Sequence, residues 1–294
     1  MKTGSPTIAI MSPGDMGHVV GAFLRRHGLR VMTSLGGRSE RTRALAEKAD
    51  IEIVADDRTV VEQADLILSI LVPAAAEPFA KHIASVIEAC GQETVFVDCN
   101  AIAPETTKRI GAVIEATGSL FVDAGIIGPP PRESSRATRF YASGSDAHRF
   151  AVLNDHGLDV RVISGTIGDA SAVKMCYAAL TKGTTALMTG LSITAERLGV
   201  SAALRTEFEI SQRPMLERMR GHVPGMVPKA HRWVGEMEEI AKTFASAGVT
   251  PKIFEGAAAV FEDVAKTPLA SVTQEEWNDA DKNYIDVVEN LADQ

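Results

Sequence analysis

The chain has 294 residues, enough for two ordinary domains that each bury a core. Its formal net charge of −8 argues against a nucleic-acid or anionic-membrane partner, because neither attracts a negative surface. The three cysteines are widely spaced, and no run of about 18 apolar residues is present to span a bilayer. We therefore expect a cytoplasmic protein without disulfides, acting on a small molecule rather than on nucleic acid or a membrane.

Short β-branched segments alternate with amphipathic segments over the first half of the chain. The strands expected there are Thr7–Met11, Arg30–Ser34, Asp65–Val72, Thr94–Asp98, Leu120–Ala124, Arg139–Ala142 and Val160–Ile163. The helices expected between them are Asp15–His27, Ser39–Lys48, Ala74–Ala89 and Pro104–Ala116. This alternation predicts right-handed βαβ crossovers and a doubly wound, mostly parallel sheet.

After Ser164-Gly165 the periodicity becomes helical and stays so. The helices expected there are Asp169–Leu198, Ala202–Met219, Trp233–Ala247, Ile253–Lys266 and Glu275–Leu291, with a break at Val223-Pro224-Gly225. The predicted fold class is α/β, with a Rossmann-type dinucleotide-binding domain over residues 1–165. An all-α domain over residues 166–294 follows it. The small, apolar residues of this half indicate a helical interface, and we expect a homodimer.

An imperfect glycine motif lies between the first expected strand and helix. Its residues, which we predict to bind a cofactor pyrophosphate, are Ser12, Pro13, Gly14, Asp15, Met16 and Gly17. Free N–H groups and the helix dipole face an anion at such a turn. Gly14 would let the pyrophosphate approach the backbone, and Gly17 would let the helix pack closely on the strand. Ser12 replaces the first glycine of G-x-G-x-x-G, so a tight turn in another α/β fold is the alternative.

The end of the second strand indicates which nicotinamide cofactor is bound. An acidic residue there binds the ribose 2′-hydroxyl of NAD, whereas arginine accommodates the 2′-phosphate of NADP. The turn offers Arg38 and Ser39 and no acidic residue, which favours NADP over NAD. Arg41 and Arg43, further on, are as readily explained as solvated residues on the outer face of a helix. Further cofactor contacts are predicted from Leu71, Val72 and Asn100.

One lysine, Lys174, lies in an otherwise apolar helical segment. Burial of a lysine is costly and lowers its pKa, which suits a proton donor or acceptor near neutral pH. The alternative is that its side chain extends to the surface. Seven histidines show no H-E-x-x-H pattern and no metal-ligand spacing, so no metal site is predicted.

Four motifs in order resemble the β-hydroxyacid dehydrogenase superfamily, the relatives of 3-hydroxyisobutyrate and 6-phosphogluconate dehydrogenases. The matching segments are Gly14–Gly17 with G-x-M-G, Asp98–Pro104 with D-x-S-T-x-x-P, Asp123–Gly128 with D-A-P-V-S-G, and Lys174 with the catalytic lysine. The second half looks like a branch whose C-terminal domain is of unknown function. The resemblance implies a dimeric oxidoreductase that moves a hydride between nicotinamide and an alcohol or carbonyl carbon, with Lys174 as the catalytic residue.

Departures from the family pattern fall on its substrate-binding positions. Asn100-Ala101 replaces a Ser-Thr pair, Ile127 replaces a serine, and Glu236 stands where a later lysine is usual. Each change removes a hydrogen-bond donor, so we expect a bulkier or less acidic substrate than a small 3-hydroxy acid. The expected substrate contacts are Asn100, Ile126, Ile127, Gly128, Tyr177 and Lys182. Imine reduction, and a non-catalytic NADP(H)-binding or sensing role, are the alternatives.

Overall fold

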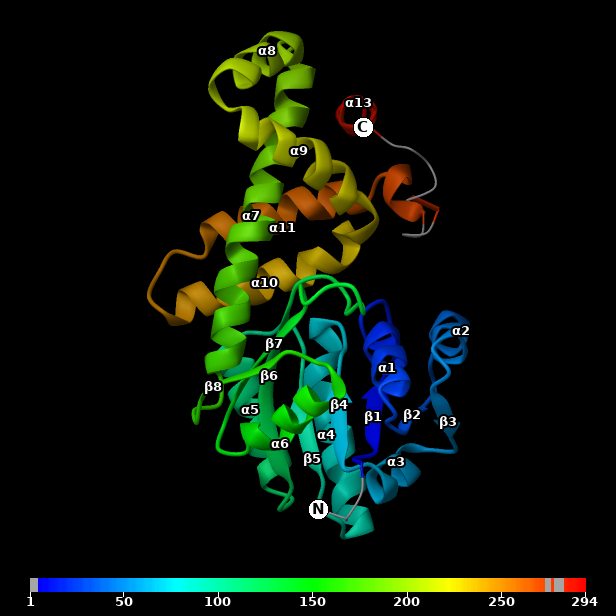
Figure 1. Ribbon diagram of the computed structural model, residues 1–294. Coiled ribbons are helices and arrows are strands. Elements are labelled where there is room, and N and C mark those ends of the chain that lie inside the picture. The colour runs from blue at the N-terminus through cyan, green and yellow to red at the C-terminus, as the bar shows by residue number, and fades with distance from the viewer. Residues whose placement is uncertain (1–4, 273–275, 278–282) are drawn as a thin grey trace. The chain divides into compact units, whose positions relative to one another are not determined.

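The computed structural model describes residues 5–272, 276–277 and 283–294 (Figure 1). The chain divides into two compact units, Met1–Met175 and Cys176–Gln294. The division falls inside a helix, later than the domain boundary that we predicted after residue 165. The first turns of this helix belong with the first unit because they pack closely against its sheet.

The first unit is built on one eight-stranded sheet with the order β3-β2-β1-β4-β5-β6-β7-β8. The strands are β1 Ile8–Met11, β2 Val31–Ser34, β3 Glu52–Val54, β4 Leu66–Ser69, β5 Val95–Asp98, β6 Leu120–Ile127, β7 Arg139–Ser143 and β8 Val160–Ser164. The first six run parallel, β7 is antiparallel to β6, and β8 is parallel to β7. Strand order reverses on either side of β1, and sheets of this kind bind ligands at the carboxyl ends of the strands there.

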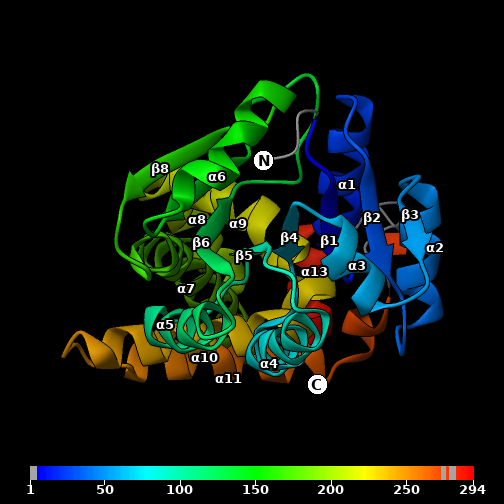
Figure 2. The ribbon, with the colours of Figure 1, turned by 90° about the horizontal axis from the view of Figure 1, so that it is seen from below.

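Helices cover both faces of this sheet (Figure 2). They are α1 Gly17–Arg26, α2 Glu40–Lys48, α3 Asp57–Gln63, α4 Pro73–Cys90, α5 Pro104–Glu115 and α6 Ala147–Ala151, with a 3₁₀ turn η1 at Val152–His156. The inner parallel strands β1, β2, β4, β5 and β6 are buried on both faces, as is typical of parallel strands. Along β1, Ile8 and Ile10 join the core beneath α1 and α6, while Ala9 and Met11 join the core beneath α4 and α5.

Besides the 3₁₀ turn η1, three short elements of the first unit were not predicted. β3 has three residues at the edge of the sheet, two of them exposed, so it shows no apolar run. α3 and α6 have seven and five residues, too few for a helical period to stand out. The sequence indicates these three elements only through the number of residues between the predicted strands.

The second unit is helical. Helix α7 Asp169–Arg197 continues into it, followed by α8 Ser201–Ser211, α9 Arg213–Met226, η2 Val227–Lys229, α10 Ala230–Ser246, α11 Lys252–Ala265, η3 Pro268–Ser271 and α13 Tyr284–Ala292. Aromatic contacts join α10 to α11: the ring centroids of Trp233 and Phe261 are 5.3 Å apart, and those of Phe244 and Phe254 are 4.3 Å apart. The Ser192 hydroxyl on α7 lies 2.8 Å from the Tyr284 hydroxyl on α13.

Two helix boundaries in this unit differ from the prediction. The helix expected over Ala202–Met219 is broken at Gln212, because Pro214 begins a new helix where its missing N–H costs nothing. The expected break at Pro224 does not occur; α9 continues to Met226, and the proline forfeits one intrahelical hydrogen bond. The helix expected over Glu275–Leu291 lies partly outside the described residues, and its described end is α13.

Candidate active site

The loop after β1 contains the predicted pyrophosphate site. Ser12 stands at the position of the first motif glycine and has φ of +56°, a left-handed conformation that is costly for L residues. A Cβ on Gly17 would lie 3.2 Å from Cγ2 of Ile10, so glycine lets α1 pack closely on β1. A Cβ on Gly14 would meet only the Ser12 carbonyl oxygen among the described atoms, at 3.9 Å, which leaves room for a phosphate. In the described structure Met16, the N-cap of α1, makes no side-chain capping bond, and the His18 N–H donates to the Gly14 carbonyl oxygen at 3.0 Å. The dipole of α1 favours an anion at this helix end.

The turn after β2 carries the residues predicted to recognise a 2′-phosphate. Arg38 is exposed, and its guanidinium carbon lies 5.8 Å from the centroid of the Phe79 ring. Ser39 is the N-cap of α2, and its hydroxyl accepts a backbone N–H at 3.3 Å. Arg41 forms a 2.6 Å ion pair with Asp15 of the glycine loop. Arg41 is thus engaged by the loop, whereas the Arg38 guanidinium lies over the Phe79 ring.

Asn100 joins the carboxyl ends of β4 and β5. Its Oδ1 accepts the Leu71 backbone N–H at 2.5 Å, and its Nδ2 donates to Oγ of Ser69 at 2.9 Å and to Asp98 at 3.1 Å. Only 2% of its surface is exposed. The side chain predicted to contact cofactor and substrate is therefore committed to internal hydrogen bonds. It orients the backbone at Leu71, next to the exposed Val72.

Two buried aspartates lie side by side in the sheet, because Asp98 of β5 is in register with Asp123 of β6. Burial, assisted by the Asp123 charge, raises the pKa of Asp98 to about 7 against two hydrogen bonds from Asn100 that lower it. Burial also raises the pKa of Asp123, against four hydrogen bonds to its carboxylate. Burial raises the pKa of the Cys99 thiol, which disfavours the reactive thiolate.

Asp123 fastens the N-terminus of α7 to β6. Its Oδ2 accepts the backbone N–H groups of Gly168 at 2.9 Å and Ser171 at 3.1 Å, and its Oδ1 accepts the Ser171 hydroxyl at 2.6 Å. The Ser143 hydroxyl donates to Oδ2 at 2.9 Å. A carboxylate at this helix end also interacts favourably with the helix dipole.

Lys174 lies in the second turn of α7, partly buried. Its ammonium donates to the carbonyl oxygen of Ile126 near the carboxyl end of β6, at 2.6 Å. Helix and strand approach closely here, because a Cβ on Gly125 would lie 2.9 Å from both the Ala170 carbonyl oxygen and the Lys174 Cβ. The predicted catalytic lysine is thus held against the strand whose carboxyl end carries three of the predicted substrate contacts.

Those three contacts are Ile126, Ile127 and Gly128. The two isoleucine side chains are 6% and 3% exposed. Gly128 has φ of +113°, and a Cβ on it would overlap the Ala137 carbonyl oxygen, so glycine is required at this turn. Three prolines at 129–131 follow and stiffen the loop.

The remaining predicted contacts belong to the helical unit. Tyr177 is 44% exposed on α7. The Lys182 ammonium forms an ion pair with Glu236 and lies 5.1 Å from the centroid of the Trp233 ring. Nε of Arg232 is 4.0 Å from the other oxygen of Glu236. Glu236, which the resemblance aligned with a later lysine, is therefore balanced by Lys182.

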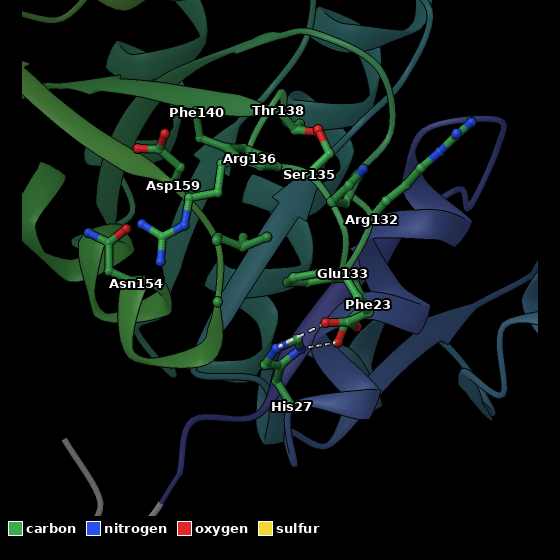
Figure 3. Close-up of a pocket in the computed structure, with 13 residues that line it drawn as sticks. Phe23, His27, Arg132, Glu133, Ser135, Arg136, Thr138, Phe140, Asn154 and Asp159 are labelled. Atoms are coloured by element: carbon green, nitrogen blue, oxygen red, sulfur yellow. Dashed lines mark hydrogen bonds and ion pairs between the residues drawn. The ribbon is translucent and has the colours of Figure 1, made fainter.

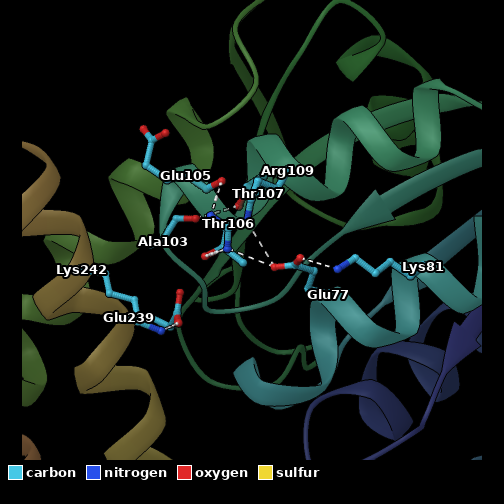
Figure 4. A network of polar contacts seen from close by, with 9 residues as sticks. All are labelled: Glu77, Lys81, Ala103, Glu105, Thr106, Thr107, Arg109, Glu239 and Lys242. Carbon is cyan, nitrogen blue, oxygen red and sulfur yellow. Dashed lines mark hydrogen bonds and ion pairs between the residues drawn. The ribbon is translucent and has the colours of Figure 1, made fainter.

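Two further polar features contain none of the predicted residues. A pocket of about 380 Å³ lies between the end of α1, the β6–β7 loop and the start of β8, where Arg136 extends toward Asn154 (Figure 3). In Figure 4, Glu77 bridges Lys81 and Arg109 in an exposed network. Within the described ranges no three His, Cys, Asp or Glu side chains are placed to hold a metal ion. No helix in the same ranges is long and apolar enough to cross a bilayer.

The motif Asp123–Gly128 predicted no individual roles for Asp123 and Gly125. An aspartate inside a buried strand was a usable signal, because such a carboxyl group needs several donors. A glycine two residues later indicated close approach of another element.

The sheet, the glycine loop at its switch point and the open helix end together define a Rossmann-type nucleotide-binding protein. The family model described as the NAD binding domain of 6-phosphogluconate dehydrogenase matches residues 7–154, half of the chain. A second model, Domain of unknown function (DUF1932), matches residues 195–264. The chain belongs to the 6-phosphogluconate dehydrogenase NAD-binding family, in the DUF1932 branch of the β-hydroxyacid dehydrogenase superfamily. The predicted superfamily and fold class are confirmed.

Similar proteins agree with this assignment. An uncharacterized 28.5 kDa protein of Methanothermus fervidus is 26% identical over 83% of this chain and 93% of its own length. A solved conserved protein of unknown function, described as similar to 3-hydroxyacid dehydrogenases, is 27% identical with a TM-score of 0.64, covering 91% of this chain and all of its own. The 3-hydroxyisobutyrate dehydrogenase of Mycobacterium tuberculosis shares the fold at 18% identity, with a TM-score of 0.67 over 98% of this chain and 99% of its own. The protein is an NAD(P)-binding oxidoreductase of the hydroxyacid dehydrogenase type.

Proposed function

We propose that the protein is an NADP-dependent oxidoreductase that transfers a hydride between nicotinamide and an alcohol or carbonyl carbon, with Lys174 as the proton donor and acceptor. One observation carries this proposal. The Lys174 ammonium is held at the Ile126 carbonyl, near the carboxyl end of β6, and the glycine loop lies at the carboxyl end of β1 in the same parallel sheet. Ligands of doubly wound sheets bind along that edge.

The residues at this edge fit a dinucleotide. Gly14 leaves room at the backbone, and the N-terminus of α1 offers N–H groups to the pyrophosphate. Arg38 is exposed where a 2′-phosphate would lie, and Arg41 is occupied by Asp15. A carboxylate near the end of β2 would instead favour NAD, but that of Asp57 is engaged by the Ser34 hydroxyl and by His82. The bound cofactor supplies or takes up the hydride at its nicotinamide ring.

The preference for NADP is tested by replacing Arg38. We expect Arg38→Ala to raise the Kd for NADPH at least about tenfold, because a charge-assisted contact contributes about 1.5–3 kcal/mol. The Kd for NADH should change by less than about twofold. The matched control is Arg43→Ala in the same helix region. Equal loss for both cofactors would contradict recognition of the 2′-phosphate.

Lys174 performs the proton transfer. In reduction, the carbonyl carbon gains the hydride and the carbonyl oxygen takes a proton from the Lys174 ammonium; in oxidation, the amine accepts that proton. We expect Lys174→Ala to lower kcat at least ~10²-fold while leaving the NADPH Kd unchanged. Lys81→Ala, which removes an exposed lysine paired with Glu77, is the control and should retain full kcat. An undiminished kcat in Lys174→Ala would overturn this role.

The substrate is inferred from what lines β6 and the neighbouring strand ends. The Asn100 side-chain amide is hydrogen-bonded within the protein, and Ile127 is apolar where the family carries a serine. The carboxyl ends of β6 and its neighbouring strand therefore offer few hydrogen-bond donors to a substrate carboxylate. We propose that the substrate is a bulkier, less acidic carbonyl compound or alcohol. Tyr177 and Lys182 are proposed as its polar contacts from the helical unit. The Lys182 charge is already balanced by Glu236, which also disfavours a strongly anionic substrate.

A panel of aldehydes, ketones, keto acids and cyclic imines, followed by NADPH absorbance, tests this substrate class. We expect ketones or aldehydes to be turned over faster than small keto acids. Faster turnover of imines would identify an imine reductase instead. Tight NADPH binding with no turnover of any compound would identify a non-catalytic NADP(H)-binding protein.

We also propose that two copies associate through the helical unit. Leu180 and Leu187 on α7 are 65% and 68% exposed, and a spacing of seven residues places them on one helix face. Exposed leucines in such a row are typical of a helix interface. Light scattering should give a dimeric mass that Leu187→Glu reduces to that of a monomer.

A further inference from the structure

We infer that Asp123 is a positioning residue, which holds the first turn of α7 against β6 and thereby places the Lys174 ammonium. The inference rests on the proposed role of Lys174. These contacts hold the Lys174 side chain before any ligand binds.

The contacts between β6 and α7 form two rungs. In the first, the Asp123 carboxylate accepts two backbone N–H groups and the Ser171 hydroxyl at the start of the helix. In the second, three residues further along each element, Lys174 donates to the Ile126 carbonyl at 2.6 Å. Between the rungs the absent side chain of Gly125 allows the helix to lie against the strand. Because a helix turn is rigid, the first rung fixes the geometry of the second.

Neighbouring side chains complete the first rung. The Ser143 hydroxyl donates to Asp123 and accepts the Ala170 N–H at 3.0 Å, which adds a second tie from the sheet to the helix. The Ser171 hydroxyl lies 2.8 Å from the Thr107 hydroxyl of α5, so the same turn is also held from the side. A buried carboxylate is costly unless its oxygens are satisfied, and here every oxygen of Asp123 has a donor.

A ligand-independent measurement tests the placement directly. The protein without cofactor is pulse-labelled with acetic anhydride over a range of pH, and acetylation of Lys174 is quantified by mass spectrometry relative to exposed Lys252. In the wild type we expect Lys174 to react slowly, because its ammonium is held at a carbonyl. In Asp123→Asn the relative labelling should rise several-fold, since an amide cannot accept the same set of donors.

The matched control is Asp65→Asn. The Asp65 carboxylate also accepts a backbone N–H, that of Thr7 at 2.8 Å, but on a segment remote in sequence from α7. It should leave Lys174 labelling unchanged. Should Asp123→Asn fail to fold, Ser171→Ala removes one donor of the same rung and is expected to raise labelling about twofold. Unchanged labelling in a folded Asp123→Asn or Ser171→Ala protein would overturn the inference, as would an equal rise in Asp65→Asn.

Kinetics on the panel compound that is reduced fastest separate positioning from general structural damage. Asp123→Asn should lower kcat about 10–100-fold in the wild-type background, because a small misplacement of a catalytic group is enough for such a loss. In the Lys174→Ala background it should lower kcat less than about twofold, since the group it positions is gone. Equal losses in both backgrounds would show that Asp123 does not act through Lys174. If Lys174 labelling rises in Asp123→Asn but Lys174→Ala keeps full turnover, the proton-donor role is overturned while the positioning role of Asp123 still holds.

Discussion

Replacement of Gly125 by alanine tests the close packing of α7 on β6. The new Cβ would lie 2.9 Å from the Ala170 carbonyl oxygen and from the Lys174 Cβ, whereas ordinary contacts begin at 3.4 Å. Helix and strand would have to separate by about half an ångström. Overpacking of this kind costs about 1–3 kcal/mol, and the lower chain entropy of alanine offsets about 0.4–1 kcal/mol of it. We therefore expect Gly125→Ala to lower the free energy of unfolding by about 1–2 kcal/mol.

Urea unfolding followed by circular dichroism measures this loss. With an m-value of about 3 kcal/mol/M, the midpoint should fall by roughly 0.5 M. The control is Gly165→Ala, because a Cβ on Gly165 meets nothing within 4 Å among the described atoms and its φ is not positive. Gly165→Ala should be neutral or slightly stabilising. A Gly125→Ala protein as stable as Gly165→Ala, with wild-type kcat, would refute the packing argument.

Three more outcomes are expected elsewhere in the molecule. Ser12→Gly should raise the free energy of unfolding by up to about 1 kcal/mol in urea melts, because it relieves a left-handed conformation; a loss of stability would contradict this. The pKa of Asp98 is about 7 in the folded protein, against an ordinary value of 3.8 that the unfolded chain restores, so unfolding releases a proton between these values. Wild-type stability should therefore fall from pH 4 to pH 7, by at most about 4 kcal/mol, and level off above pH 7. Asp98→Asn should reduce this slope, because only the raised pKa of Asp123 then remains among the two buried carboxyl groups, and an identical slope would refute the assignment. Cys176 is exposed and should react rapidly with a thiol reagent in the native state, whereas buried Cys99 should react only on unfolding.

Much of the fold could be predicted from local patterns. The alternating apolar runs identified seven of the strands, and the glycine loop was placed correctly between β1 and α1. The break at Gln212 shows the limit of such local patterns. The periodicity of Ala202–Met219 predicts one helix, yet Pro214 is better accommodated at the start of a second helix. β3 was missed because an edge strand needs no apolar run.

The site was predicted less completely, since its geometry depends on contacts distant in sequence. Lys174 was recognised from its apolar surroundings, but the carbonyl group to which it donates, that of Ile126 on β6, lies 48 positions earlier. Asn100 was expected to face ligands because of its place after β5. Its actual partners, at Ser69 and Leu71, become neighbours only when β4 and β5 pair.

The stiff turn after β6 has a consequence for ligand selection. Gly128 admits no larger residue, and the prolines at 129–131 have their φ angles fixed by their rings. A surface with so few accessible conformations loses little entropy when a ligand settles against it. It also has no means of reshaping itself around a larger molecule. Ligand selectivity at this turn should therefore follow steric exclusion, with a sharp limit on ligand size. An adaptable loop would instead give a gradual decline of affinity with ligand size.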